Sequence, residues 1–234
     1  MKKNNKRIWI AAAVGLVCLT GGYATYDYFT GNHVEIEEVI PASGGVQPEP
    51  SSASAAVSVQ ADQLNGSWSI GEPSHVYFTV KTSREEVNFS MDSVTGDWLF
   101  DLNNPNNMTG EGIVDLASLS SGNSQRDSHI ASPDFLQTDA HPTATFKASS
   151  FELNTSEWKE GQVVPLSISG TMNVKGIDKE VVFDSQALYS ENSLKLSGTT
   201  KVTFEDFGLT NPHKVVLSTE NELTVRLELQ LTKA

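Results

Sequence analysis

Apolar and polar residues alternate strictly through the segment Leu223-Thr224-Val225-Arg226-Leu227-Glu228-Leu229-Gln230-Leu231. Successive side chains of a β-strand point to opposite faces, so this pattern predicts a strand with one buried face and one face toward water. A surface helix would instead place apolar residues at every third or fourth position. The segment therefore predicts a one-sided β-strand.

The same two-residue period recurs through the chain upstream of this segment. The clearest candidates, in which apolar residues and glycine alternate with polar ones, are residues 76–80, 166–174 and 194–204. Weaker candidates are residues 68–70, 87–91, 98–100, 108–116, 144–151 and 181–188. Turn-forming residues at 175–179 and 189–193 are typical of antiparallel hairpins. We expect an all-β fold of about eight strands that closes into an extended antiparallel barrel, because closure removes exposed strand edges.

One polar segment interrupts this series of strands. It reads Ser124-Gln125-Arg126-Asp127-Ser128-His129-Ile130-Ala131-Ser132-Pro133-Asp134-Phe135, and we expect a short helical crossover here that caps the sheet structure. The adjacent Arg126 and Asp127 have two main interpretations. We favour a structural salt bridge or helix cap; the alternative is that Arg126 contacts the polar head group of a ligand.

Charge, cysteine content and motif spacing argue against several classes of protein. The net charge is −13, and no basic cluster follows the first seven residues, which argues against nucleic-acid binding. Cys18 is the only cysteine, so disulfides within the chain and thiolate metal sites are excluded. The five histidines have no HxH or HExxH spacing, and no serine lies in a GxSxG context. We therefore predict no metal site, no cofactor and no catalytic residues.

The first 30 residues have the pattern of a membrane segment. Four basic residues among the first seven precede an apolar run from Ile8 to about Tyr26, and such a run of roughly 19 residues is long enough to span a bilayer. Four aromatic residues near its end resemble an interfacial aromatic belt, namely Tyr23, Tyr26, Tyr28 and Phe29. Gly22-Tyr23-Ala24, in contrast, would suit a signal peptidase. We favour a single-pass anchor in the cell membrane, with the rest of the chain outside the cytoplasm. The alternative is a cleaved signal and a secreted or periplasmic protein.

Residues 31–62 form the next unit, which is rich in Pro, Ser, Ala and Gly. Such a composition buries too little apolar surface to order itself, so we expect a flexible linker. Residues 63–234 then form one barrel domain.

The motifs of this last region resemble those of a known family. In chain order they are Gly66-Ser67-Trp68-Ser69-Ile70, Ser74-His75-Val76-Tyr77-Phe78-Thr79-Val80, Ser124-x-Arg126-Asp127-x-His129-Ile130, Ser132-Pro133-Asp134-Phe135-Leu136, His141-Pro142-Thr143-Ala144-Thr145-Phe146, Gly170-Thr171-Met172-Asn173-Val174-Lys175-Gly176 and Asp206-Phe207-Gly208-Leu209. Together they resemble the YceI-like, polyisoprenoid-binding domain of bacterial exported proteins, from about Leu64 to Lys233. The family commonly has an Arg just before the last motif, whereas this chain has Phe204-Glu205 there. A head-group role for an arginine at this position is therefore in doubt here.

The resemblance implies a lipocalin-like barrel that holds an isoprenoid chain in an apolar tunnel. The two-residue period gives the candidate wall residues Phe78, Trp98, Phe100, Phe146, Ile168, Met172, Phe183, Leu196, Phe204 and Leu227. Small residues in phase with them would keep the tunnel open, namely Gly110, Gly112, Ala144, Gly170 and Gly198. The glycines have an equally good interpretation as bulges or bends at barrel corners.

We therefore predict an extracytoplasmic carrier or scavenger of an isoprenoid or other long apolar lipid, attached to the cell membrane by its N-terminal helix. The alternative is a ligand-free barrel with a filled core that acts as an extracytoplasmic interaction or stress-response module. Composition does not separate the two, because tunnel walls and barrel cores use the same residue types.

Overall fold

The computed structural model describes residues 31–41, 58–155, 157–211 and 219–234. The predicted membrane segment and the middle of the predicted linker lie outside these ranges. No helix in the described part of the chain is long and apolar enough to cross a membrane.

Strands make up most of the described chain. They are β1 (Ser58–Val59), β2 (Gly66–Thr82), β3 (Glu86–Met91), β4 (Val94–Thr95), β5 (Asp97–Phe100), β6 (Thr109–Asp115), β7 (Thr143–Leu153), β8 (Trp158–Lys159), β9 (Val163–Val174), β10 (Ile177–Ser190), β11 (Ser193–Thr203) and β12 (Thr219–Lys233). The helices are all short: α2 (Ala61–Leu64), α3 (Ser124–Ala131) and the 3-10 turns η1 (Pro105–Asn107), η2 (Leu116–Ser118) and η3 (Glu205–Phe207).

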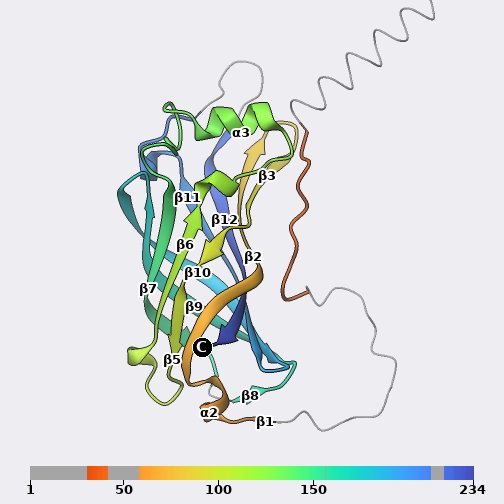
Figure 1. Cartoon of the computed structure of the whole chain (residues 1–234), viewed down its shortest axis with the longest axis vertical. Coiled ribbons are helices and arrows are strands. Elements are labelled where there is room, and N and C mark those ends of the chain that lie inside the picture. Colours follow the sequence, from red (N-terminus) through yellow and green to blue (C-terminus); the bar gives the residue numbers. More distant parts are fainter. Residues whose placement is uncertain (1–30, 42–57, 156, 212–218) are drawn as a thin grey trace, which may run out of the picture.

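The long strands form one antiparallel sheet that closes on itself (Figure 1). Strands β9 to β12 pair in chain order, and β12 pairs with β2 to complete the ring. The strands that follow one another around the ring are β2, β5, β6, β7, β9, β10, β11 and β12. The structure therefore confirms the predicted closed, antiparallel, all-β barrel of about eight strands.

Strand β2 has two different partners on one of its sides. Residues 66–69 pair with β5, and residues 76–81 pair with β3. The bridge between Ser90 and Ser120 then joins β3 to the chain before α3. Residues 68–70 and 76–80 were predicted as separate strands, but they belong to one strand whose register against β12 shifts between them.

The barrel is filled at the end where β2 begins. Trp68, Trp98, Phe151, Ile168 and Leu196 are buried there, and the rings of Trp98 and Phe151 meet edge to face with centroids 6.1 Å apart. Their side chains come from strands on opposite sides of the ring, so they close this end with a packed core.

Helix α3 lies across the other end of the barrel (Figure 1). The side chain of Asn123 caps it, because its Oδ1 accepts hydrogen bonds from the N–H groups of Gln125 and Arg126 at 3.1 Å each. The helix ends at Ala131, since Pro133 disfavours helical geometry at the residue before it. A short helix thus lies where the crossover was expected.

Residues 31–41, which we call the strap, lie along the outside of β2 and β3 (Figure 1). Asn88 of β3 holds the upper part of the strap. Its N–H donates to Oδ1 of Asn32 at 2.9 Å, and its Nδ2 donates to the carbonyl of Val34, also at 2.9 Å. Further down, the N–H of Glu37 donates to the hydroxyl of Tyr77 at 3.1 Å, so the strap covers this outward-facing ring.

The lower end of the strap covers Glu228 on the outer face of β12. This carboxylate is fully buried and accepts hydrogen bonds from the N–H of Val39 at 2.8 Å, from Oγ of Ser197 at 2.7 Å and from Nε of Arg226. Burial alone would lower the pKa of Arg226, but its hydrogen bonds to Glu228 and then to Glu38 raise it. The strap therefore buries a carboxylate that would otherwise face water, and the N–H of Val39 takes the place of one hydrogen bond to solvent.

These contacts correct the expectation of a flexible linker at both ends of residues 31–62. Residues 31–41 pack on the barrel, and residues 58–62 contain β1, which pairs with β8, and the start of α2. Local composition did not reveal this, because both segments are held in place by hydrogen bonds to residues far away in the chain.

Candidate functional site

A cavity of about 390 Å³ occupies the barrel below α3. Its apolar lining comes from Phe78, Val80, Val87, Phe89, Ile130, Phe135, Leu136, Met172, Val174, Val202, Phe204, Phe207, Leu209, Leu223 and Val225. The polar residues that the described chain adds to this lining are Thr82, Arg126, His129 and Thr219. The wall is thus almost wholly apolar, with its polar groups at the α3 end.

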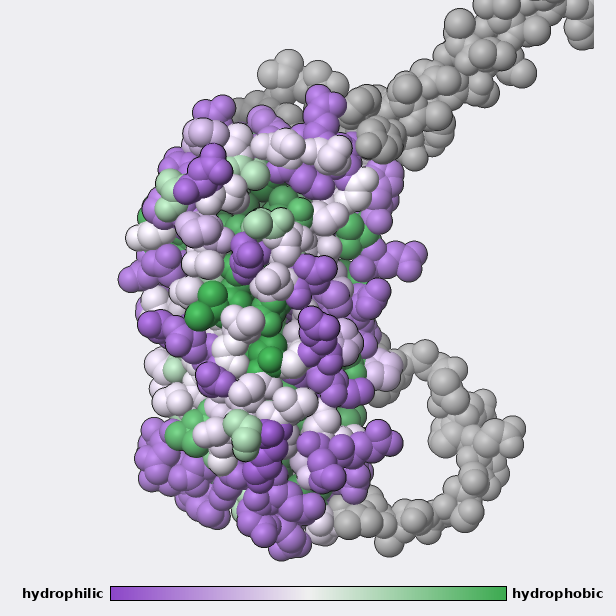
Figure 2. Space-filling model, viewed as in Figure 1, coloured by the Kyte–Doolittle hydropathy of each residue, from purple (hydrophilic) through white to green (hydrophobic). Residues whose placement is uncertain are grey.

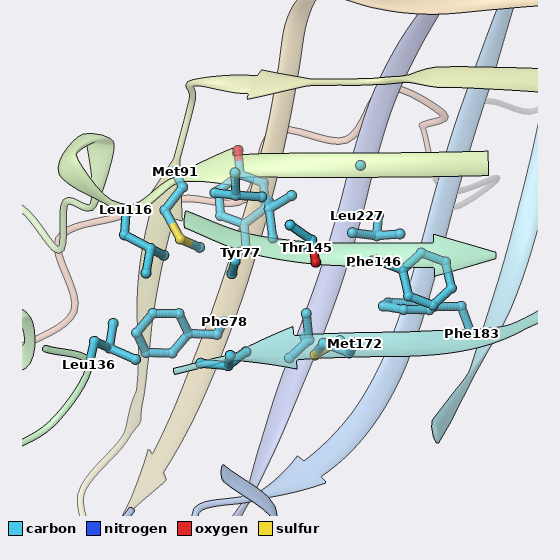
Figure 3. A pocket seen from close by; sticks show the side chains of 16 residues that line it. Tyr77, Phe78, Met91, Leu116, Leu136, Thr145, Phe146, Met172, Phe183 and Leu227 are labelled. Carbon is cyan, nitrogen blue, oxygen red and sulfur yellow. The ribbon is translucent and has the colours of Figure 1, made fainter. Parts of the chain in front are cut away.

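A second cavity of about 120 Å³ lies deeper in the barrel. Its lining is shown in Figure 3, where Phe146 and Phe183 lie together at one end and Leu116 and Leu136 at the other. The rings of Phe146 and Phe183 meet edge to face with centroids 4.9 Å apart, and they separate the cavity from the filled core. The two cavities adjoin, because five residues line both: Phe78, Leu136, Met172, Val174 and Val225.

The larger cavity meets solvent at the α3 end, which we call the mouth. His129 is exposed there, and Arg126, Ile130 and Thr82 are half-buried. Figure 2 shows a mainly hydrophilic outer surface with hydrophobic residues visible in recessed places. A lipid chain that entered at the mouth would pass from polar surroundings directly into an apolar interior.

Arg126 lines the mouth and also joins three parts of the structure. Its Nε donates to Oγ of Ser121 at 2.9 Å, and its Nη2 donates to the carbonyl of Gly31 in the strap at 3.0 Å. The guanidinium carbon lies 5.8 Å from the centroid of the Phe89 ring. Burial lowers the pKa of Arg126, although Asp127 and Glu85 oppose this change. These bonds give Arg126 a structural role, and its position also places a cation beside the cavity.

Asp127 binds Ser121, the same residue that Arg126 contacts. Its Oδ1 accepts hydrogen bonds from both the N–H and the hydroxyl of Ser121. Arg126 and Asp127 therefore meet on Ser121, and the helix cap is Asn123. This arrangement differs from the direct salt bridge that we considered from sequence, because successive helical residues point in different directions.

The ten predicted wall residues fall into two groups. Those that line a cavity are Phe78, Phe146, Met172, Phe183, Phe204 and Leu227. The other four are at most 2 % exposed and lie in the core outside both cavities, namely Trp98, Phe100, Ile168 and Leu196. The two-residue period gives the face of a strand but not the height along the barrel, so it did not distinguish the two groups.

Several cavity residues from β3 and from the chain around α3 were not predicted from the sequence. Val87 and Phe89 alternate within a segment that was predicted as a strand, and Phe89 stacks on Phe78 with ring centroids 4.3 Å apart. The same period could therefore have identified them. Ile130 and Phe135 had no such signal, because a helix that crosses the end of a barrel is placed by tertiary packing.

The small residues differ in what surrounds them. Gly112 and Ala144 line the inner cavity, and a Cβ on Gly112 would have Ile70 as its nearest neighbour at 4.0 Å. A Cβ on Gly170 would instead lie 2.2 Å from the carbonyl of Lys147, so this glycine permits close approach of two strands. Gly110 and Gly198 would likewise collide with neighbouring side chains. The tunnel-opening interpretation therefore fits Gly112 and Ala144, and the packing interpretation fits the other three glycines.

Phe204-Glu205, where the family commonly has Arg, lies at the start of η3, near the mouth. Asp206 accepts hydrogen bonds from Nζ of Lys179 and from the N–H of Thr203, the latter at 2.8 Å. The bond from Lys179 and then that from Thr203 lower the pKa of Asp206. A lysine from β10 is thus the cation that this carboxylate contacts. In the described part of the chain, no three His, Cys, Asp or Glu side chains are grouped to hold a metal ion.

Comparison with known proteins agrees with this geometry. The family model described as YceI-like domain matches residues 68–231. A UPF0312 protein of Shewanella sp. (strain W3-18-1) is 26 % identical over 147 residues, which is 59 % of this chain and 73 % of the relative. A UPF0312 protein of Azotobacter vinelandii is 28 % identical over 120 residues, covering 49 % of this chain and 59 % of the relative.

Solved structures share the fold at lower identity. Burkholderia cenocepacia BcnA superposes with a TM-score of 0.58 and 16 % identity, over 67 % of this chain and 95 % of that one. A polyisoprenoid binding domain from Saccharophagus degradans, implicated in plant cell wall breakdown, gives a TM-score of 0.56 and 13 % identity, over 71 % and 98 %. With a family match that spans most of the barrel, this chain belongs to the YceI-like domain family.

Proposed function

We propose that this protein binds an isoprenoid or similar long apolar lipid in the barrel and carries or sequesters it without catalysing a reaction. The observation that carries the proposal is the pair of adjoining apolar cavities between α3 and the filled core. The larger one is within the range of roughly 300–1,000 Å³ that is usual for small-molecule sites. The solved relative described as a polyisoprenoid binding domain supports the choice of ligand class.

Burial of the lipid chain would supply most of the affinity. Each CH₂ group moved from water into an apolar site contributes about 0.8 kcal/mol. Association itself costs on the order of 4–15 kcal/mol, so several isoprene units must enter before binding becomes favourable. A shallow site at the mouth would not meet this requirement, which is why the deeper cavity matters.

Selectivity for the head group would come from the polar residues at the mouth. Arg126 and His129, together with the hydroxyls of Thr82 and Thr219, can donate hydrogen bonds there to a polar or anionic group, and the Arg126 guanidinium also carries a positive charge. Arg126 already donates to Gly31 and Ser121, so we propose that it also contributes to head-group recognition while it holds the strap.

We further propose that the barrel lies outside the cytoplasm and is anchored by the apolar run that ends near Tyr26. The basic residues before this run and the acidic, cysteine-free chain after it support this orientation. Protease treatment of intact cells should remove the barrel. A barrel that stays protected until the cells are lysed would contradict this location.

The alternative is a ligand-free interaction module. The packed core around Trp68 and Trp98 favours it for one end of the barrel, because no chain could enter there. Native mass spectrometry of the purified protein, followed by lipid extraction, separates the two proposals. A co-purifying long-chain lipid supports the carrier; a protein that takes up no polyprenol when it is supplied supports the interaction module.

A further inference from the structure

We propose that the strap fixes the barrel with its mouth toward the membrane surface, so that lipid passes directly between the bilayer and the cavity. The partner is a lipid bilayer, and the contacting surface is the mouth formed by α3 and the turn between β2 and β3. This inference rests on the proposed N-terminal anchor.

The direction of the strap carries the argument. Its first residue, Gly31, is held at the mouth by Arg126, and the N–H of Asn32 donates to Oε2 of Glu85 beside the β2–β3 turn at 3.3 Å. Its other end reaches Glu228, which pairs with His75 in the middle of β2. The chain therefore arrives at the mouth and then runs away from it along the wall.

The covalent chain sets how far the mouth can be from the apolar run. Tyr26 and Gly31 are five residues apart in the sequence, and an extended chain spans at most about 3.6 Å per residue. Gly31 therefore lies within about 18 Å of the end of the run. Tyr28 and Phe29, which suit the membrane interface, come even closer to Gly31 in sequence.

Without the strap, the same anchor would leave the barrel free to move and turn. The barrel would then begin at Ser58, which is 32 residues after Tyr26. A flexible chain of that length has a mean span of roughly 30 Å and much longer extremes. The strap thus shortens the effective tether and keeps the mouth end of the barrel toward the bilayer.

Electrostatic attraction does not supply this orientation. The chain has a net charge of −13, so anionic lipid head groups repel it as a whole. The short, docked tether is the feature that would hold the mouth near the bilayer against this repulsion.

Proximity can be measured on full-length protein in vesicles. In a Cys18→Ser background, Ser128→Cys places a fluorophore on the exposed face of α3, and Asn106→Cys places one in η1 at the opposite end of the barrel. The vesicles contain phosphatidylcholine and a rhodamine-labelled lipid as energy acceptor. We expect strong energy transfer from position 128 and little from position 106.

Two matched insertions test the role of the strap. A flexible Gly/Ser spacer of about 12 residues, with a mean span of roughly 20 Å, is inserted either after Thr30 or after Gly45. The first insertion lengthens the tether before the strap and should remove most of the transfer from position 128. The second lies after the strap contacts and should leave the transfer unchanged.

Three results would overturn the inference. One is equal transfer from both positions in the uninserted chain, and another is an equal effect of the two insertions. The third is protein that does not float with the vesicles, which would also refute the anchor. Polyprenol binding by the same preparation in detergent would then still support the lipid carrier, so the two proposals fail separately.

Discussion

Replacement of Gly112 by Leu should fill the inner cavity and separate lipid uptake from folding. Gly112 lines this cavity, and a Cβ added at this position would have its nearest heavy atom 4.0 Å away, on Ile70. A leucine side chain therefore has room to enter. It would occupy space that the lipid chain needs in the proposed complex.

The expected magnitudes follow from four added carbon atoms. Their burial contributes up to about 3 kcal/mol, against about 0.5–1 kcal/mol of lost side-chain entropy. The free energy of unfolding of the lipid-free protein should then rise by about 1–2 kcal/mol after imperfect packing is allowed for. If the ligand loses four buried carbons, its affinity should fall by about 3 kcal/mol, or more than 100-fold.

Gly110 provides a matched control on the same strand and the same face. A Cβ there would lie 2.4 Å from the ring of Trp98, so Gly110→Leu should destabilise the filled core. Urea denaturation and equilibrium binding of a radiolabelled polyprenol measure the two quantities for both variants. Full polyprenol affinity in a stably folded Gly112→Leu protein would refute the placement of the lipid in the inner cavity. A large loss of stability would show that the space beside Gly112 is not open.

Three further substitutions test the strap and the charged groups. Arg126→Ala removes the bond to Gly31 and should cost about 1–3 kcal/mol of stability, with faster proteolysis within residues 31–41; a stable variant that had lost polyprenol binding would assign Arg126 mainly to the head group. Glu228→Ala removes the carboxylate that accepts from Val39, Ser197 and Arg226 and should cost about 1.5–3 kcal/mol in urea denaturation, whereas Glu222→Ala on the same strand breaks an exposed ion pair worth at most about 1 kcal/mol; similar losses would contradict this assignment. Folding lowers the pKa of Asp206 from 3.8, so the ionised carboxylate stabilises the fold at higher pH and this contribution disappears as the pH falls through the lowered pKa. The difference in urea midpoint between the wild type and Asp206→Asn should therefore shrink between about pH 5 and pH 2. A difference that stays constant with pH would contradict this role of Asp206.

The strands could be predicted from the sequence because their signal is local. Alternation through residues 223–231 and 166–174 fixed both the strand and the inward face, and the structure agrees with both. Alternation did not give the position of each side chain along the barrel axis. Met172 lines both cavities, while Ile168, four residues earlier on the same face, lies in the packed core.

The strap could not be predicted, because its partners are distant in the chain and mostly polar. Val39 and Glu228 are 189 residues apart, and their hydrogen bond joins a backbone group to a buried carboxylate. Read locally, Glu228 is a polar residue on the solvent face of a strand. The physical cause of its burial is a second layer of chain on the barrel, which leaves no periodic signal in either segment.

The division of the barrel into a packed end and a hollow end has a consequence for how such proteins can diverge. At the packed end, shortening a side chain such as Trp98 or Leu196 leaves a void and costs about 2–5 kcal/mol, which is a large part of the stability of a domain. At the hollow end, residues such as Val174 and Val225 border empty space, so a change of size there alters the shape of the cavity more than it disturbs packing. If the cavity binds a lipid as proposed, selection can adjust the length and branching of that lipid at one end, while the other end preserves folding.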